Sequence, residues 1–185
     1  IITGTGKYYN EISATDSQGL KGGNYTTALN LLANRDDYRF NLITAPGLIY
    51  ENADQATPLN SLVSNIESRG DAIIVMDLKG YGATVNGTTT TAASVDSSYV
   101  ASYWPWVQIS DTDTGQLVWV PASTMMPGVY ANNDRTSEAW FAPAGINRGG
   151  LGNVVQAERK LTQANRDALY TGKVNPIATF PGRGV

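Results

Sequence analysis

Residues 71–77 constrain the fold most, because five apolar side chains follow one another between two aspartates with no polar alternation. Such a run predicts a β-strand that is covered on both faces, as the strands of a parallel sheet are. An amphipathic helical pattern at residues 58–69 precedes it, and a strand pattern at residues 39–43 precedes the helix. Strand, helix and buried strand predict a βαβ crossover, which is nearly always right-handed.

Turn and capping residues set the expected bounds of these elements. The spacing predicts Thr57 as the N-cap of the helix, Pro58 at its first position and Gly70 just past its end. Ala45-Pro46-Gly47 predicts a turn that closes the first strand. An earlier helix is expected to begin at Asn24 as its cap and to end at residues 34–37.

The middle of the chain combines a polar segment with a hairpin pattern. Residues 80–94 contain four consecutive threonines, and we expect a mobile surface loop there. Asp96 is expected to cap a short helix through residue 102. Residues 106–109 alternate, and a turn separates them from the returning segment 116–120, which predicts a β-hairpin with Gly115 at positive φ.

The remaining pattern completes an α/β architecture. We expect a helix after Pro121, a short turn or strand at residues 154–160, a last helix between Thr162 and Gly172, and a closing strand at residues 176–180. The inward side chains of the two helices are expected to be Met125, Met126, Val129, Tyr130, Ala164, Ala168 and Leu169. The prediction is an α/β fold, a layered sheet with flanking helices and a β-hairpin excursion. Residues 1–23 are expected to form an edge strand and loop that lead into one domain at residues 24–185.

Composition excludes several classes of function. A chain of 185 residues with 42% hydrophobic residues can bury one sizeable core. Sixteen acidic and thirteen basic residues, without a basic run, argue against a nucleic-acid-binding surface. The chain has no cysteine, which excludes disulfides and thiolate metal sites, and no histidine, which removes the usual general base. No apolar run has the length of a membrane span.

Ligand-binding motifs are present only in part. Asp111-x-Asp113-x-Gly115 begins like a calcium loop, but Ala122 occupies the position of the final acidic ligand. Gly4-Thr5-Gly6 lacks the third glycine of a dinucleotide motif. Gly80-x-Gly82 follows a buried strand, but we expect no helix N-terminus after it that could hold a phosphate. We therefore predict no cofactor and no metal.

Catalytic arrangements are also incomplete, so no catalytic residue is predicted. Ser123 or Ser137 could act as a nucleophile only with a lysine as base. The carboxylates of the acidic pairs are expected to be solvated, and the four tryptophans are expected to lie in the core rather than on a sugar-binding platform. These side chains are Asp36, Asp37, Asp71, Asp77, Trp104, Trp106, Trp119 and Trp140. A hydrolase or nucleotide-binding enzyme with an unrecognised site and a carbohydrate-binding module remain alternatives.

Residues 138–152 contain two adjacent aromatics, a proline and four glycines, and we expect them to bury Trp140 and Phe141 and then to bend sharply. Related segments flank this loop: Tyr103-Trp104-Pro105-Trp106-Val107, Trp119-Val120-Pro121-Ala122-Ser123, Gly128-Val129-Tyr130-Ala131, Asn175-Pro176-Ile177 and Phe180-Pro181-Gly182. In that order and spacing the chain resembles the tail sheath protein family of contractile-tailed (T4-like) bacteriophages. The resemblance is specific over residues 96–185 and looser before them.

The resemblance implies a structural role and no enzymatic activity. Members of that family stack as rings around the tail tube and contract to drive the tube through the host envelope. Their shared α/β domain has a subtilisin-like fold without the activity, and a subtilisin triad would need the histidine that this chain lacks. The implied partners are further copies of the sheath protein, the tail tube protein, and baseplate and tail terminator proteins, with no direct nucleic acid and no membrane insertion. The implied location is the virion, with the host cytoplasm during assembly.

The resemblance also implies a longer protein, in which an N-terminal arm, inserted domains and a C-terminal domain lie outside this chain. A contracting lattice needs rigid subunits joined by individually weak polar contacts that can be remade. Charged residues near the 138–152 loop suit such contacts, although an ordinary solvated face is equally compatible with them. The hypothetical inter-subunit contact residues are Asp134, Arg135, Glu138, Arg148, Glu158, Arg159 and Lys160.

Overall fold

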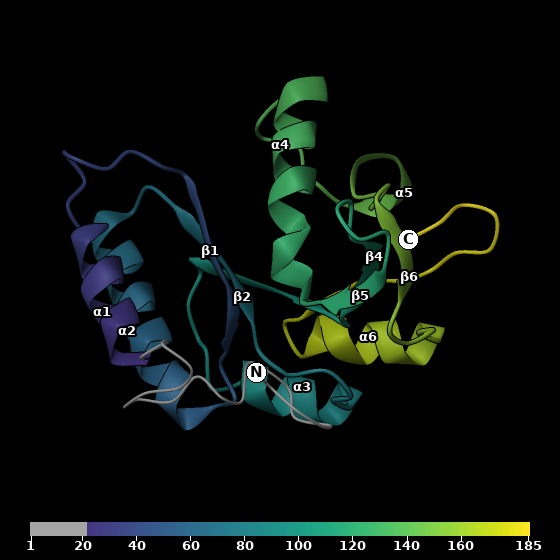
Figure 1. The fold of residues 1–185 in the computed structure, drawn as a ribbon, viewed down its shortest axis with the longest axis horizontal. Helices are drawn as coiled ribbons and strands as arrows, with labels where there is room; N and C mark the ends of the chain where they lie inside the picture. Colours follow the sequence, from purple (N-terminus) through teal and green to yellow (C-terminus); the bar gives the residue numbers. More distant parts are fainter. Residues whose placement is uncertain (1–21) are drawn as a thin grey trace.

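A parallel sheet forms the centre of the computed structural model, which describes residues 22–185 (Figure 1). Its strands are ordered β1-β2-β3-β7, and a smaller antiparallel sheet has the order β5-β4-β6. The strands are β1 (Leu42–Ile49), β2 (Ile73–Asp77), β3 (Val100–Trp104), β4 (Val107–Ser110), β5 (Leu117–Val120), β6 (Val154–Ala157) and β7 (Asn175–Pro176). The helices are α1 (Gly22–Leu31), α2 (Ala53–Arg69), α3 (Val85–Ala92), the 3-10 turn η2 (Ala122–Thr124), α4 (Met126–Thr136), α5 (Gly145–Arg148) and α6 (Gln163–Thr171). The predicted α/β class with a hairpin is confirmed.

The predicted crossover is present, since β1, α2 and β2 follow one another and the two strands are parallel. Strand β2 is covered on both faces, as its sequence predicts. Ile74 and Met76 face a core made with α1, α2, α3 and α6, whereas Val75 faces a second core made with η2 and α4. Figure 1 shows α1 and α2 on one side of β1 and β2 and α4 on the other. The sheet is therefore the middle layer of three.

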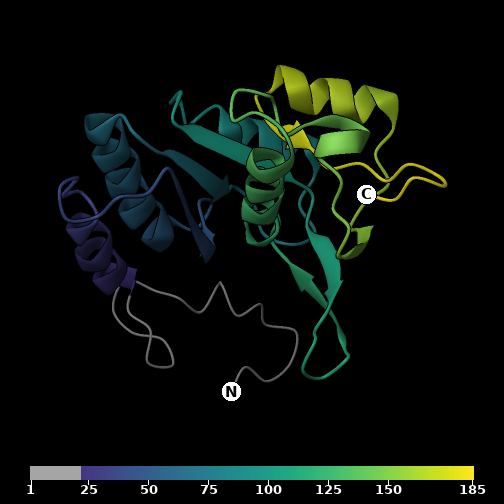
Figure 2. The ribbon, with the colours of Figure 1, turned by 90° about the horizontal axis from the view of Figure 1, so that it is seen from above.

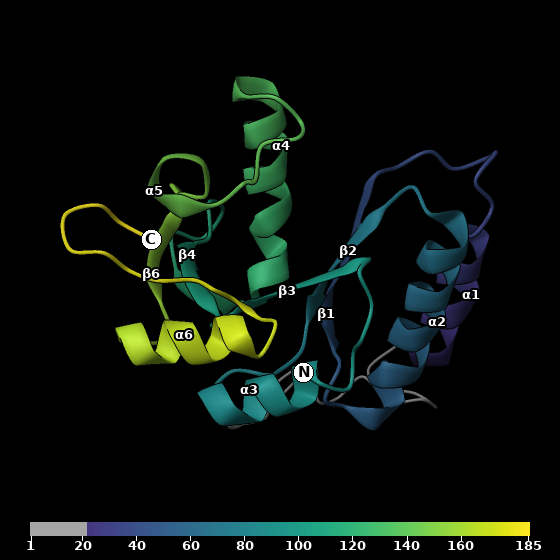
Figure 3. The same cartoon turned by 180° about the vertical axis from the view of Figure 1, so that it is seen from behind.

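Helices α3 and α6 pack against each other, as Figure 3 shows. Thr162 caps α6 by accepting a hydrogen bond from Asn165 N, and Gly172 follows its end, as predicted. A side chain at position 172 would overlap Thr89 on α3, so glycine is needed there for close packing. Leu169 is fully buried, but Ala164 and Ala168 are exposed, so their predicted inward orientation is wrong. The buried face of α6 therefore includes Leu169 but not the two alanines, although their spacing had suggested one apolar face.

The hairpin of β4 and β5 is confirmed, with Gly115 at φ 68°. Strand β6 pairs with the other edge of β4, so residues 154–157 are a strand. The helix expected after Pro121 forms as η2 and α4, and Val129 and Tyr130 face the sheet, where the Tyr130 hydroxyl lies 2.8 Å from that of Tyr103.

Three predicted boundaries in the first third of the chain are wrong. Helix α1 begins at Gly22, so Asn24 lies inside it and does not cap it. Strand β1 continues through Pro46 and Gly47 to Ile49, because an edge strand with a bulge tolerates a proline without an N–H. Helix α2 begins five residues before Pro58, because Asn52 accepts a hydrogen bond from Asp54 N and caps it there.

Residues 80–94 and 96–102 also differ from expectation. The threonine segment folds as α3, in which Thr88 is buried and its hydroxyl donates to the Thr84 carbonyl. Thr84 caps this helix by accepting a hydrogen bond from Gly87 N, so a helix N-terminus does follow Gly80-x-Gly82. Residues 100–102, which were expected to end a helix capped by Asp96, instead belong to β3, because pairing with β2 outweighs the local helix propensity.

Predictions were also made for the two ends of the chain. The predicted leading strand in residues 1–23 lies outside the described residues, apart from Gly22 and Gly23 in α1. The closing strand is shorter than expected, since β7 comprises only Asn175 and Pro176. Within residues 22–185, no helix is long and apolar enough to cross a membrane.

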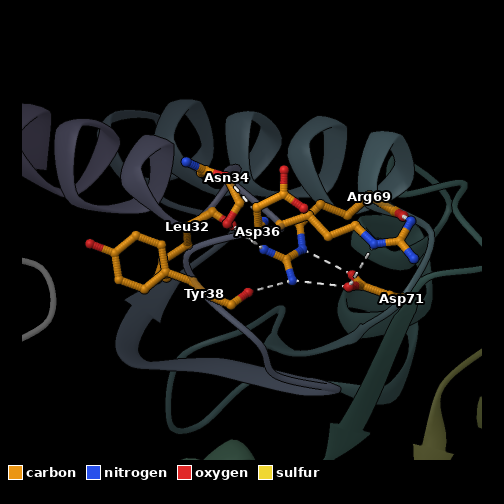
Figure 4. A network of polar contacts seen from close by, with 7 residues as sticks. Leu32, Asn34, Asp36, Tyr38, Arg69 and Asp71 are labelled. Atoms are coloured by element: carbon orange, nitrogen blue, oxygen red, sulfur yellow. Dashed lines mark hydrogen bonds and ion pairs between the residues drawn. The ribbon is translucent and has the colours of Figure 1, made fainter.

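Arg69 joins the end of α2 to the segment between α1 and β1 (Figure 4). Its side chain is 2% exposed and donates to the carbonyl oxygens of Leu32 at 2.6 Å and Tyr38 at 2.9 Å. Two further bonds, of 2.9 and 3.0 Å, reach the Asp71 carboxylate, and the guanidinium lies 4.1 Å from the centre of the Phe40 ring. One buried cation therefore holds the end of α2 and the segment between α1 and β1 together.

Candidate interaction surface

Asp77 and Ser123 form a hydrogen-bonded pair of a carboxylate and a serine hydroxyl, which are groups that catalytic sites also use. Asp77 ends β2 and Ser123 lies in η2, and the two residues are 5% and 1% exposed. The backbone N–H and the hydroxyl of Ser123 both donate to the Asp77 carboxylate. Burial raises the pKa of Asp77 to about 6, although both hydrogen bonds act to lower it. The expectation that Asp77 is solvated is therefore wrong, and the pair joins β2 and η2 in the interior of the fold.

The other acid of that predicted pair, Asp71, lies apart from Asp77 at the surface. Its side chain is 28% exposed and is bound by Arg69 and, at 3.6 Å, by Arg35. The hydrogen bonds from Arg69 lower the pKa of Asp71. The two carboxylates therefore have separate structural partners and share no reacting centre.

The raised pKa of Asp77 predicts an unusual dependence of stability on pH. The folded chain holds the proton more tightly than the unfolded chain, so stability is highest below pH 4 as far as this group is concerned and falls as pH rises toward 7. The shift corresponds to about 3 kcal/mol. We expect Asp77→Asn to remove this decline, measured as the free energy of unfolding in urea between pH 4 and 7.

Asp71→Asn is the matched control, because the pKa of Asp71 is lowered and its titration lies below that pH range. The absence of histidine removes the usual titrating group near pH 6. An unchanged pH slope in Asp77→Asn would show that the buried carboxylate is not its source.

Trp140 and Phe141 lie at the surface, so their predicted burial is wrong. Trp140 is 78% exposed, and its ring stacks on Phe141 with centroids 4.4 Å apart. The buried Asn133 amide of α4 donates to the Phe141 carbonyl, and Arg148 at the end of α5 lies 4.6 Å from the centre of the Phe141 ring. We call Trp140, Phe141 and Arg148 the aromatic ledge. An exposed aromatic cluster of this kind is typical of a contact surface.

A groove of about 840 Å³ lies beside the ledge, between α5, the edge formed by β3 and β7, and residues 180–185. Its lining is largely apolar and includes Ile146, Leu151 and Ile177. Among the described residues, the charged members of the lining are Arg166 and Arg183, and none of its side chains is acidic. The surface as a whole suits a segment with both apolar and negatively charged groups.

Four of the predicted contact residues lie close to the aromatic ledge. Asp134 and Arg135 are exposed on the last turn of α4, Glu138 is exposed in the segment that follows, and Arg148 belongs to the ledge itself. Within residues 22–185, none of the four takes part in an ion pair. They are therefore available to a neighbouring molecule.

The other three predicted residues form a separate group after β6. The Glu158 side chain is 4% exposed and accepts a hydrogen bond from Gly82 N at 2.8 Å, so it is an internal contact. Arg159 is partly exposed and lies near Glu158 and the Gly82 carbonyl, and Lys160 is exposed. Figure 1 shows β6 running from α5 toward α6, which separates this group from the aromatic ledge. The seven residues therefore do not form one surface.

Sequence reasoning missed the groove and several exposed apolar side chains, among them Leu117, Val155 and Tyr170. No local pattern separates the exposed Trp140 from a core tryptophan, because its exposure follows from the turn at residues 139–141 after α4. Among the described residues, no group of histidine, cysteine or acidic side chains could hold a metal ion.

The chain matches the family model described as the phage tail sheath protein central domain over residues 18–185. Similar curated proteins are the tail sheath proteins of Vibrio phage KVP40, at 35% identity over 96 residues, and Enterobacteria phage T4, at 31% over 96 residues. The tail sheath protein of Salmonella phage ViI is 29% identical over 90 residues. These matches cover 52%, 52% and 49% of this chain but only 13%, 14% and 14% of the relatives, so the chain corresponds to a small part of their length.

Proposed function

Because the chain belongs to the phage tail sheath family, we propose that it is part of a structural subunit of a contractile tail sheath. The match over residues 18–185 is the observation that carries this proposal. In this role the whole protein polymerises around the tail tube and contracts to drive the tube through the host envelope. It acts in the virion, after assembly in the host cytoplasm.

The described residues suit a building block better than an enzyme. Their serine and carboxylate pair is closed to solvent, and their large groove is lined by apolar side chains and two arginines. A catalytic pocket needs convergent polar groups within reach of a substrate. The proposed partners are further copies of the same protein, the tail tube protein, and the baseplate and tail terminator proteins. We propose no catalytic activity and no direct contact with nucleic acid.

Electron microscopy of the full-length protein tests the proposal. We expect the protein to form tubes or stacked rings, alone or on isolated tail tubes. Full-length protein that remains monomeric under both conditions would contradict a sheath function.

Arg148→Ala in the full-length protein is expected to weaken assembly by about tenfold, because arginines at desolvated contacts often contribute more than 1 kcal/mol. Arg148 contacts the exposed Phe141 ring and has no ion-pair partner within residues 22–185. The measurement is the lowest protein concentration at which polymers sediment.

Arg159→Ala provides the matched control, because that side chain contacts Gly82 and Glu158 of its own chain. It should leave the critical concentration within about twofold of the wild type. Equal effects of the two variants would show that the aromatic ledge has no special part in assembly.

A further inference from the structure

The groove beside the aromatic ledge has a charge pattern that defines the chemistry of its occupant. Arg183 lines the groove and is exposed, and within residues 22–185 its side chain makes no hydrogen bond and no ion pair. Arg166, on α6, donates to the Leu161 carbonyl and lies 5.5 Å from the centre of the Phe180 ring. Apolar lining and unopposed positive charge together favour a segment that presents a carboxylate next to an aliphatic side chain.

The turn between β4 and β5 has this composition. Residues 80–134 contain no lysine or arginine, so the negative charge of the turn is not compensated by neighbours in sequence. Asp113 is exposed at the turn, and Leu117, at the start of β5, is 54% exposed. We call residues 111–117 the acidic turn.

Hydrogen bonds within the acidic turn fix its shape. The Asp111 carboxylate accepts bonds from Asp113 N at 3.1 Å and from the Thr114 hydroxyl, and the Asp111 carbonyl accepts one from Gly115 N at 2.8 Å. Asp111 is therefore used to hold the turn, and Asp113 is left as the carboxylate that can meet a partner. A turn that is ordered before binding loses less conformational entropy on association.

The acidic turn cannot occupy the groove of its own chain. Figure 2 shows the β4–β5 hairpin extending away from α6 and from the segment at residues 180–184, both of which line the groove. A contact between the two features therefore needs two molecules. Because each copy carries one groove and one turn at different places, the contact is head-to-tail and can continue from copy to copy.

We propose that the groove binds the acidic turn of a second copy of this chain, with Asp113 against Arg183 and Leu117 against the apolar lining. This inference rests on the proposed sheath function, because it names one contact through which the copies associate. Head-to-tail contacts that do not close produce the open, helical assemblies that a sheath requires.

A charge exchange in the full-length protein tests the contact. Asp113→Arg and Arg183→Glu each place like charges opposite one another, and each should raise the critical concentration for polymerisation by about tenfold or more. The double variant restores an opposite pair in reversed order, and we expect it to return to within about threefold of the wild type. Sedimentation gives the critical concentration, and circular dichroism verifies that each variant is folded.

Asp96→Arg is the matched control, since Asp96 is an exposed acid outside both features that forms an ion pair with the exposed Lys173. It should polymerise like the wild type. Polymerisation of the wild type together with unaffected single variants would overturn the contact and leave the sheath function in place. Loss of assembly in Arg183→Glu alone would also overturn it, because the groove would then be filled by another segment. Wild-type protein that never polymerises would instead refute the sheath function itself.

Discussion

Arg69→Ala is expected to lower the free energy of unfolding by about 3–5 kcal/mol, the range typical for breaking a buried charged network. The substitution removes the donors for the Leu32 and Tyr38 carbonyls and both bonds to Asp71 (Figure 4). It also removes the contact with the Phe40 ring. The loss is large because one buried side chain supplies several charge-assisted hydrogen bonds, and all of them are lost together. Urea denaturation of the 185-residue chain at pH 7 measures the loss.

Arg35→Ala is the control, because Arg35 pairs with the same Asp71 carboxylate but its side chain is 67% exposed. Exposed pairs contribute about 0–1 kcal/mol, so this variant should remain close to the wild type. Arg69→Lys keeps the charge but lacks the planar fork that reaches two carbonyls and a carboxylate together, and it should fall between the two. Equal stability of Arg69→Ala and Arg35→Ala would contradict the role assigned to the buried network.

The Arg69 network shows where prediction from the sequence reaches its limit. Gly70 at the end of α2 was predicted because a helix terminus is a local signal. Arg69, one residue earlier, was not singled out, because its acceptors at Leu32 and Tyr38 come from a segment more than 30 residues away in the chain. The pairing becomes visible only after α1, α2 and β1 have packed.

Elsewhere, the sequence predicted an element correctly when the residues that determine it lie within that element. The β4–β5 hairpin followed from its alternation and from Gly115, and the start of α6 followed from Thr162. The threonine segment in α3 was mistaken for a loop because threonine has weak helix propensity. The cap at Thr84, hydroxyl bonds such as that from Thr88 to the Thr84 carbonyl, and packing against α6 stabilise that helix in the folded chain.

The candidate surface was the hardest part to predict, because exposure depends on what surrounds a side chain. The sequence suggested a buried Trp140, and the structure places it outside. The hypothesis of charged contacts named Arg148, which is exposed on the aromatic ledge, but it also included Glu158, whose side chain is internal. Whether Trp140 is buried, and whether a charged side chain such as Glu158 is internal, can be decided only once the path of the chain after α4 is known. The contact roles of the exposed residues stay predictions.

Trp104→Ala is the second substitution with a large expected effect, again about 3–5 kcal/mol of the free energy of unfolding. Trp104 ends β3, is 2% exposed, and belongs to the core that joins the sheet to α2, α3 and α6. Its indole N–H has no hydrogen-bond partner among the described residues, so its contribution comes from packing. Trp104→Phe should therefore cost less, because it fills most of the volume and removes a buried donor without a partner.

Trp140→Ala is the matched control for Trp104→Ala, since the same residue type is removed from a position that is 78% exposed. Its effect on the free energy of unfolding should stay within about 0.5 kcal/mol, measured by far-UV circular dichroism because both changes remove a fluorophore. If the ledge is a contact surface, Trp140→Ala should instead weaken polymerisation of the full-length protein while the fold stays intact. Two variants with equal stability would mean that the inside and outside of this domain have been assigned wrongly. A stable Trp140→Ala protein that polymerises normally would remove the ledge from the assembly contacts and leave the fold unaffected.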